Sequence, residues 1–247
     1  MNDAVIRLDG VSKAFDGRKV LDDVSIEVAA GTAFCLLGRS GTGKSVTLKH
    51  IVGLLKPDRG RIIVHGKNVP ALNAHELADV RRSMGFLFQN AALFDSISVG
   101  ENVAFPLRRH TDWADAKIRE VAMRKLTDVG LEKDYDKMPA DLSGGMKKRA
   151  GLARAMALDP ALLLVDEPSA GLDPITGDEI DELLLGLKRQ GGTTLVVVTH
   201  DIASAKRLGD TLLVLHEGRI AASGTAADLE RSQDPIVRAF MSSQHSG

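Results

Sequence analysis

The sequence has little of several residue types, and each shortage narrows the class of protein. Of its 247 residues only one is cysteine, and aromatic residues make up 4%. A single cysteine excludes a disulfide within the chain, which is typical of a reducing compartment. Cys35 lies in an apolar run and is expected to be a small buried hydrophobic residue. The net charge of −1 gives no overall basic field, so we expect no nucleic-acid partner.

Long hydrophobic runs are also lacking. No stretch approaches the roughly 20 apolar residues that cross a bilayer. The first residues lack the basic and apolar regions of a signal peptide. We therefore expect a soluble protein that acts at a membrane only through a partner. The composition, 44% hydrophobic and 26% charged, is ordinary for a globular chain that can bury its own core.

The hydrophobic pattern predicts an α/β fold. Residues 4–30 alternate around Asp-Gly pairs at 9–10 and 16–17, which predicts antiparallel strands and hairpins. Apolar runs at 32–37, 162–165, 195–199 and 212–215 predict strands buried on both faces, separated by helical patterns. Such alternation favours a core with a parallel sheet. Apolar residues at helical spacing in 118–129 and 146–158 indicate a helical insert between about 90 and 160.

One segment after the 32–37 run fits the pattern G-x-x-x-x-G-K-[ST] and precedes a helix expected at 45–52. Its residues are Gly38, Arg39, Ser40, Gly41, Thr42, Gly43, Lys44 and Ser45. Glycines let backbone N–H groups wrap phosphates, and the helix N-terminus adds a positive dipole end. Lys44 can reach the β- and γ-phosphates, and the Ser45 hydroxyl can ligate Mg²⁺. The segment predicts a magnesium-dependent ATPase.

Two acids follow the apolar run 162–165. Asp166 is placed to hold Mg²⁺, directly or through water, and Glu167 to orient or deprotonate the attacking water. By itself, an acid pair after a strand more often lies in a solvated loop without a function. The presence of the phosphate loop in the same sequence favours the functional interpretation. Gln89 and His200 also stand at predicted strand ends, where ligands bind in α/β sheets, although alone each would be a surface residue.

The sequence Leu142-Ser143-Gly144-Gly145-Met146 begins the helix expected at 146–158. Ser143 can cap that helix, and Gly144 and Gly145 let the backbone approach an anion. The simpler interpretation is a capped helix with a flexible entry.

The order of these motifs resembles the ATP-binding cassette (ABC) family. In that family's terms the phosphate loop is the Walker A motif, Gln89 the Q-loop, residues 142–145 the signature, Asp166 and Glu167 the Walker B end, residues 169–173 the D-loop and His200 the H-loop. The resemblance implies a single ABC ATPase domain over residues 1–247: a P-loop NTPase core at about 1–89 and 160–220, a helical subdomain at 90–159 and a tail at 221–247. It implies a head-to-tail dimer in which the signature of one subunit closes over ATP held by the other. It also implies ATP contacts beyond the phosphate loop. Phe15 would stack on the adenine, Val46 would contact the nucleotide, Asp173 would act across the dimer interface and His200 would contact the γ-phosphate. Many members carry Tyr where Phe15 stands. Gln89 would contact Mg²⁺ and sense the membrane partner; with Glu167, His200 and Lys44, it forms the expected catalytic set.

Several stretches resemble the ATPase subunits of Mla-type lipid transporters: residues 88–96, 101–108, 138–139, 173–176 and 234–240. Met146 departs from the Gln common in ABC signatures and agrees with this subfamily, and Asp141 replaces the usual Glu. The resemblance implies phospholipid transport between the membranes of a Gram-negative bacterium. Its implied partners are an integral membrane permease, a substrate-binding protein of the MCE type and an accessory STAS-domain subunit. The ATPase would then lie on the cytoplasmic face of the inner membrane.

Two other functions remain open. One is an importer ATPase for a small polar solute, which residues 90–108 disfavour. The other is a soluble ABC ATPase acting on DNA or ribosomes; such proteins usually carry a long coiled coil or two fused cassettes, and this sequence has neither.

Overall fold

In the computed structural model, which describes residues 4–242, the alternating pattern near the start of the chain forms two long antiparallel strands. β1 (Ala4–Phe15) and β2 (Arg18–Ala29) are joined at Asp16 and Gly17, both with positive φ, as predicted for a tight hairpin turn. The turn predicted at residues 9–10 is wrong. Gly10 lies inside β1, where the register shifts between Leu8 and Val11, and its positive φ makes a bulge.

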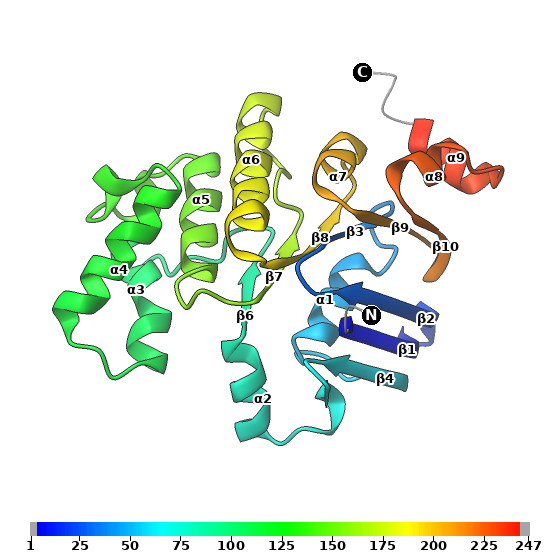
Figure 1. Cartoon of the computed structure of the whole chain (residues 1–247), viewed down its shortest axis with the longest axis horizontal. Coiled ribbons are helices and arrows are strands. Elements are labelled where there is room, and N and C mark those ends of the chain that lie inside the picture. Colours follow the sequence, from blue (N-terminus) through cyan, green and yellow to red (C-terminus); the bar gives the residue numbers. More distant parts are fainter. Residues whose placement is uncertain (1–3, 243–247) are drawn as a thin grey trace. The chain divides into compact units, whose positions relative to one another are not determined.

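The chain forms two compact units (Figure 1), one made of residues up to Arg81 and from Leu187 onward, the other of Arg82–Gly186. In the first unit, β1 lies between β2 and β4 (Arg59–Val64), and β5 (Lys67–Asn68) follows β4 at the edge. The N-terminal antiparallel sheet predicted from the sequence is thus present.

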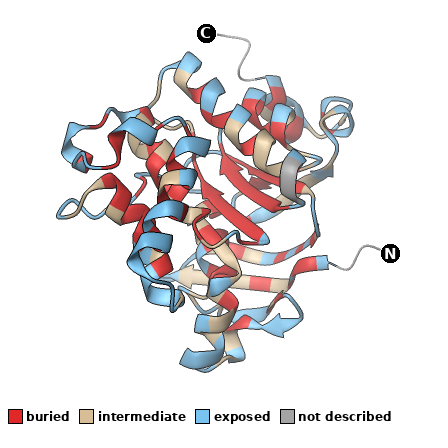
Figure 2. Cartoon of the chain, turned by 60° about the vertical axis from the view of Figure 1, so that its left-hand side comes forward, coloured by how far each residue is buried: buried red, intermediate tan, exposed pale blue. Residues whose placement is uncertain are grey.

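The same unit holds three of the four strands that were predicted to be buried, and the fourth, at 162–165, lies in the second unit. β3 (Ala33–Leu37) pairs in parallel with β8 (Thr194–Thr199) and with β9 (Thr211–His216), and β10 (Arg219–Gly224) adds an antiparallel edge. Every residue of β3 and β8 is buried, as expected for central strands of an α/β sheet. Figure 2 shows these strands coloured as buried, whereas the helices are buried along one face.

The helices of the first unit are mostly short. They are α1 (Lys44–Ile51), the 3₁₀ turn η1 (Val69–Ala71), α2 (Ala74–Arg82) at the unit boundary, α7 (Ile202–Leu208), α8 (Ala226–Glu230) and α9 (Pro235–Ser242). α1 confirms the helix predicted after the phosphate loop. The expected tail reaches beyond α9, and residues 243–247 lie outside the described residues.

In the second unit, two parallel strands, β6 (Met84–Leu87) and β7 (Leu162–Asp166), bracket a helical segment. That segment contains α3 (Val99–His110), α4 (Asp115–Asp128), the 3₁₀ turns η2 (Glu132–Asp134) and η3 (Pro139–Asp141), and α5 (Gly144–Ala155). α6 (Pro174–Gly191) follows β7. Every regular element between residues 90 and 159 is therefore helical, while the exact division into core, insert and tail stays a prediction. Within residues 4–242, no helix has both the length and the apolar character to cross a membrane.

Candidate active site

The phosphate loop leaves β3 and enters α1, as its sequence predicts, and two of its glycines have no room for a side chain. A Cβ on Gly38 would lie 2.5 Å from the Leu215 carbonyl oxygen. A Cβ on Gly43, whose φ is 102°, would lie 2.6 Å from the Val20 carbonyl oxygen. The loop therefore runs in direct contact with the backbone of β2 and β9, and only glycine allows that approach.

The beginning of α1 is suited to an anion. Its first turn contains no acidic residue, and Gly43 at the N-cap offers no side chain to its N–H groups. The buried Lys44 ammonium donates to the carbonyl oxygens of Gly38 (2.7 Å) and Arg39 (3.1 Å), which places it inside the curve of the loop. The Thr42 hydroxyl donates to the Arg39 carbonyl at 2.9 Å. A cradle of backbone donors with an ammonium inside it fits a phosphate chain.

The other predicted residues of the loop differ in exposure. Ser40 and Gly41 are exposed at its outer side, whereas Ser45 and Val46 are half-buried in the first turn of α1. Ser45, whose contact with Mg²⁺ stays a prediction, directly follows the lysine in α1.

Strand register places His200 at the edge from which the phosphate loop leaves. Leu37, the last residue of β3, is opposite Thr199, the last residue of β8. The chain therefore enters the phosphate loop and reaches His200 at neighbouring positions, and His200 is exposed. This agrees with the expectation that both lie at the carboxyl ends of parallel strands.

Phe15 is the last residue of β1, and 41% of its surface is exposed. The next strand, β2, contains Val20, whose carbonyl oxygen lies against Gly43 of the phosphate loop. The Lys13 ammonium lies 5.4 Å from the centre of the Phe15 ring. Asp58 fixes this end of the strand, because its carboxylate accepts from Lys13 Nζ at 2.8 Å and from the Ala14 N–H at 2.7 Å. The same two donors, Lys13 first, hold the pKa of Asp58 below its ordinary value. An exposed ring on a fixed backbone is available for stacking.

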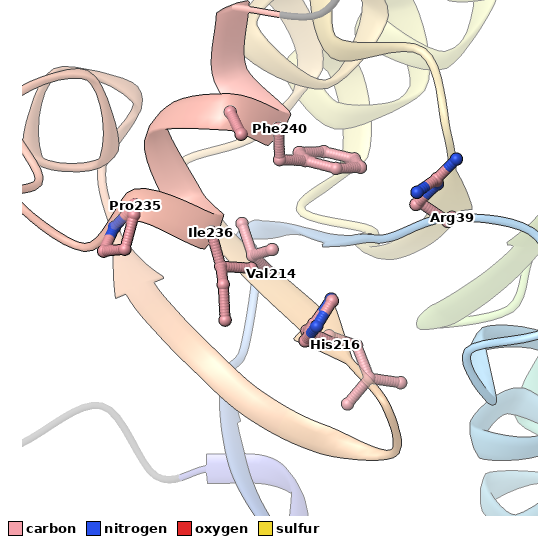
Figure 3. A pocket seen from close by; sticks show the side chains of 8 residues that line it. Arg39, Val214, His216, Pro235, Ile236 and Phe240 are labelled. Carbon is pink, nitrogen blue, oxygen red and sulfur yellow. The ribbon is translucent and has the colours of Figure 1, made fainter.

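A cavity of about 670 Å³ borders the phosphate loop at Arg39 (Figure 3). Its other walls come from the end of β9 and from one side of α9, where Ile236 and Phe240 line it. Apart from Arg39, none of the residues that line this cavity belongs to the predicted site. It is a separate hollow beside the phosphate loop.

In the second unit, the acid pair stands at the carboxyl end of β7. Asp166 and Glu167 are buried, at 7% and 8% exposure, and Glu167 has a positive φ of 48°. Leu87 at the end of β6 is opposite Val165 on β7, so the exposed Gln89 follows β6 at the edge where Asp166 ends β7 and Glu167 follows it. The structure therefore brings these three predicted residues to one end of a strand pair.

Sequence reasoning missed one residue of this region, Lys148 on α5. Its ammonium is buried and donates to the Glu167 carbonyl oxygen at 2.7 Å. Burial lowers the pKa of Lys148 to about 8, against the opposing effect of the Asp166 and Glu167 carboxylates. Helical spacing offered a signal: Lys148 falls on the same face of α5 as the buried Gly145 and Leu152, where a charge needs a partner.

The signature begins α5, and the D-loop precedes α6. The Ser143 hydroxyl accepts from the Met146 N–H at 3.2 Å, which confirms the predicted cap, and both Ser143 and Gly144 are exposed. Gly145 is buried, and a Cβ there would lie 2.4 Å from the Thr176 methyl carbon. Asp173 accepts from the Thr176 hydroxyl (2.6 Å) and N–H (3.1 Å), which keeps its pKa low. Asp173 thus caps the start of α6, a local role that the sequence did not indicate.

A glycine-rich loop between a parallel strand and a helix, with acids at the end of another buried strand, defines a P-loop nucleotide-binding protein. The more particular class follows from sequence comparison. A model of the family described as ABC transporter matches residues 21–170. The chain belongs to this family and is an ABC ATPase, as its motif order predicted.

Curated relatives span nearly the whole chain. The probable ribonucleotide transport ATP-binding protein mkl of Mycobacterium tuberculosis is 42% identical over 98% of this chain and 67% of its own length. The intermembrane phospholipid transport ATP-binding protein MlaF of Escherichia coli is 40% identical over 96% of this chain and 88% of its own. MlaF of Haemophilus influenzae is 38% identical over 100% of this chain and 94% of its own.

Solved structures agree with the fold. The ATP-binding cassette MJ0796, solved as a dimer in a post-hydrolysis state with ADP and Pi, superposes with a TM-score of 0.83 at 32% identity, covering 89% of this chain and 98% of that one. CbiO1 from Clostridium perfringens, part of the transporter complex cbiONQ, gives a TM-score of 0.84 at 29% identity, covering 97% of this chain and 96% of that one. The predicted fold class, family and ATP binding are confirmed, while the roles of individual residues stay predictions.

Proposed function

We propose that this chain is the ATPase subunit of a transporter that moves phospholipids between the inner and outer membranes. The observation that carries the proposal is its similarity to MlaF proteins over nearly the full length of both chains. The Mla-type residues at 88–96 and 101–108 support the same conclusion. The subunit would lie on the cytoplasmic face of the inner membrane, attached through the permease.

ATP would be held by the phosphate loop through Val46, with Phe15 on the adenine and His200 at the γ-phosphate. The open N-terminus of α1 and the ammonium of Lys44 inside the loop support the phosphate contacts. Ser45, Gln89 and Asp166 are the proposed Mg²⁺ ligands. Their hydroxyl, amide and carboxylate oxygens suit a hard cation, which proteins usually hold with one or two carboxylates plus substrate phosphates. Mg²⁺ there would neutralise charge on the phosphates.

Glu167 is the proposed base, because it is a buried carboxylate next to the proposed metal ligand Asp166. Ser143, Gly144, Gly145 and Asp173 would act on the ATP of a second copy. The exposure of Ser143 and Gly144 at the start of α5 supports such a contact, as does the dimeric state named for a solved cassette of this fold. The functional unit would therefore be a homodimer.

A permease would contact the segment that follows Gln89. Asn102, fully buried on α3, fixes this segment: its side chain accepts from the Phe94 N–H and donates to the carbonyl oxygens of Phe94, Ile97 and Ser98. Phe94 and Phe105 remain 45% and 47% exposed, with ring centres 4.9 Å apart. An exposed aromatic pair on a rigid support suits a partner helix.

Two further subunits complete the proposal: a substrate-binding protein of the MCE type and a STAS-domain subunit. Their support is the Mla-type sequence stretches and the similarity to MlaF.

A second candidate is import of a small polar solute. One observation favours it: mkl, at 42% identity, is named for ribonucleotide transport. The soluble, nucleic-acid-associated alternative has weaker support, because the net charge is −1 and residues 4–242 contain no coiled-coil insertion.

Affinity purification from membranes, with mass spectrometry of co-purifying proteins and lipids, separates these functions. We expect a multi-spanning permease, an MCE-type protein and bound phospholipid. Recovery of a permease with a nucleotide-binding or amino-acid-binding protein in place of the MCE-type protein would support the small-solute function. Recovery without any membrane protein, together with ATPase activity stimulated by nucleic acid, would contradict both transport functions.

A further inference from the structure

Lys148 joins the signature helix to the end of the acid-bearing strand. It is 5% exposed, and its ammonium donates to the carbonyl oxygen of Glu167 at 2.7 Å, across 19 residues of sequence. The same oxygen accepts a longer bond, 3.3 Å, from the Ala170 N–H. Burying an ammonium requires compensation, and here a carbonyl oxygen and two nearby carboxylates supply it.

The backbone that Lys148 contacts has an unusual conformation. Glu167 has φ of 48°, in the left-handed region that residues with a Cβ rarely adopt. Such a conformation persists only where surrounding contacts hold it. The Glu167 side chain extends from this backbone, so its direction depends on the groups that hold the backbone, and Lys148 makes the shorter of the two bonds given above to its carbonyl oxygen.

The other end of α5 is the signature itself. Ser143 caps the helix and Lys148 follows five residues later, about 7.5 Å along the axis at the usual rise of an α-helix. Gly145, between them, lies directly against Thr176, which limits how α5 can bend there. The signature and Lys148 thus stand on one short helix, so a displacement of its first turn would also move the backbone that carries Lys148.

We infer that Lys148 is a positioning residue through which each ATP site of the dimer senses the other. The inference rests on the proposed function, in which Ser143 and Gly144 contact ATP held by the second copy while Glu167 serves the ATP of its own copy. Engagement of the signature by the second copy's ATP fixes α5, and Lys148 then sets Glu167 for hydrolysis. Hydrolysis thereby requires nucleotide on both sides.

The test compares ATP turnover by the full chain with three variants: Lys148→Met, Lys148→Arg and, as a matched control, Lys147→Met. Lys147 is the neighbouring lysine on α5 and is only half-buried. We expect Lys148→Met to lower kcat about tenfold to a hundredfold, a range known for small misplacements of catalytic groups. Its affinity for ATP should stay close to that of the parent, and the Hill coefficient for ATP should fall toward one. Lys148→Arg should restore both quantities, and Lys147→Met should leave them unchanged.

Thermal unfolding identifies variants that do not fold. If Lys148→Met is unfolded, Lys148→Ala replaces it, since it leaves room for water beside the acids. A methionine or alanine variant that folds and keeps the parent's kcat and Hill coefficient would overturn the inference, as would an arginine variant as impaired as the methionine variant. Failure of the proposed function gives a different result: the parent itself would show no turnover, or turnover independent of its concentration.

Discussion

Glu167 shows how much a single residue of this site depends on its surroundings. It follows β7 in a left-handed backbone conformation and is 8% exposed. Its neighbour Asp166 belongs to the strand itself and is equally buried. The strand ends at Asp166, and the backbone changes to a left-handed conformation at Glu167. This change is why we propose different roles for the two buried carboxylates. Asp166 would hold the metal ion and Glu167 the water.

At this scale we predict the effect of Glu167→Gln. The amide keeps the size of the side chain but cannot take a proton, so hydrolysis should fall by about 10²- to 10⁴-fold while ATP still binds. The variant should accumulate as a closed dimer in MgATP, measured by size-exclusion chromatography with light scattering. Glu132→Gln, on an exposed turn, is the matched control and should behave as the parent. Hydrolysis by Glu167→Gln at the parent rate would refute the assignment of the base.

Among the elements, α5 and α6 show why some glycines of the signature are structural. Gly145 faces the Thr176 methyl, whereas the nearest atom to a Cβ on Gly144 is a Leu172 methyl carbon at 3.4 Å. The packing therefore excludes a side chain at Gly145 but not at Gly144. Gly145 lets α5 and α6 approach each other, whereas the exposed Gly144 would leave its backbone open to the proposed ATP contact.

This difference predicts the stability of two alanine variants. Gly145→Ala should lower the free energy of unfolding by about 1–3 kcal/mol, the usual cost of overpacking, because the new methyl overlaps Thr176. Gly144→Ala should have little effect on stability. Adding Thr176→Ser to Gly145→Ala removes the obstructing methyl, keeps the hydroxyl that bonds Asp173, and should recover part of the loss. Urea denaturation measures all three; equal stability of the two single variants would contradict the packing argument.

The sequence predicts those elements whose conformation is set by neighbouring residues, and it fails where contacts between distant residues decide the conformation. The phosphate loop, the strands at 33–37, 162–166 and 194–199, and the Ser143 cap follow from short-range patterns, and each was predicted. The turn at Asp9 and Gly10 failed because an Asp-Gly pair also fits a bulge, and the long pairing of β1 with β2 and β4 decides between them. The contact of Lys148 with Glu167 joins residues that no local pattern relates.

For the whole molecule, the family and the fold make this chain an ABC ATPase, and the proposed role of its exposed signature would leave a single copy incomplete. Ser143 and Gly144 present a capped, open helix start to solvent, while the phosphate loop already has its own lysine in place. If the signature acts on the ATP of a second copy, as proposed, two chains must combine to form two complete sites. Association should therefore limit activity at low concentration.

The dependence of ATP turnover on protein concentration tests this account most directly. The steady-state rate per subunit, at saturating MgATP, is measured for the full chain across the range in which the dimer dissociates, with light scattering on the same samples. We expect turnover per subunit to fall toward zero as the dimer dissociates, in proportion to the fraction of dimer. Turnover per subunit that stays constant through that range would contradict the shared site.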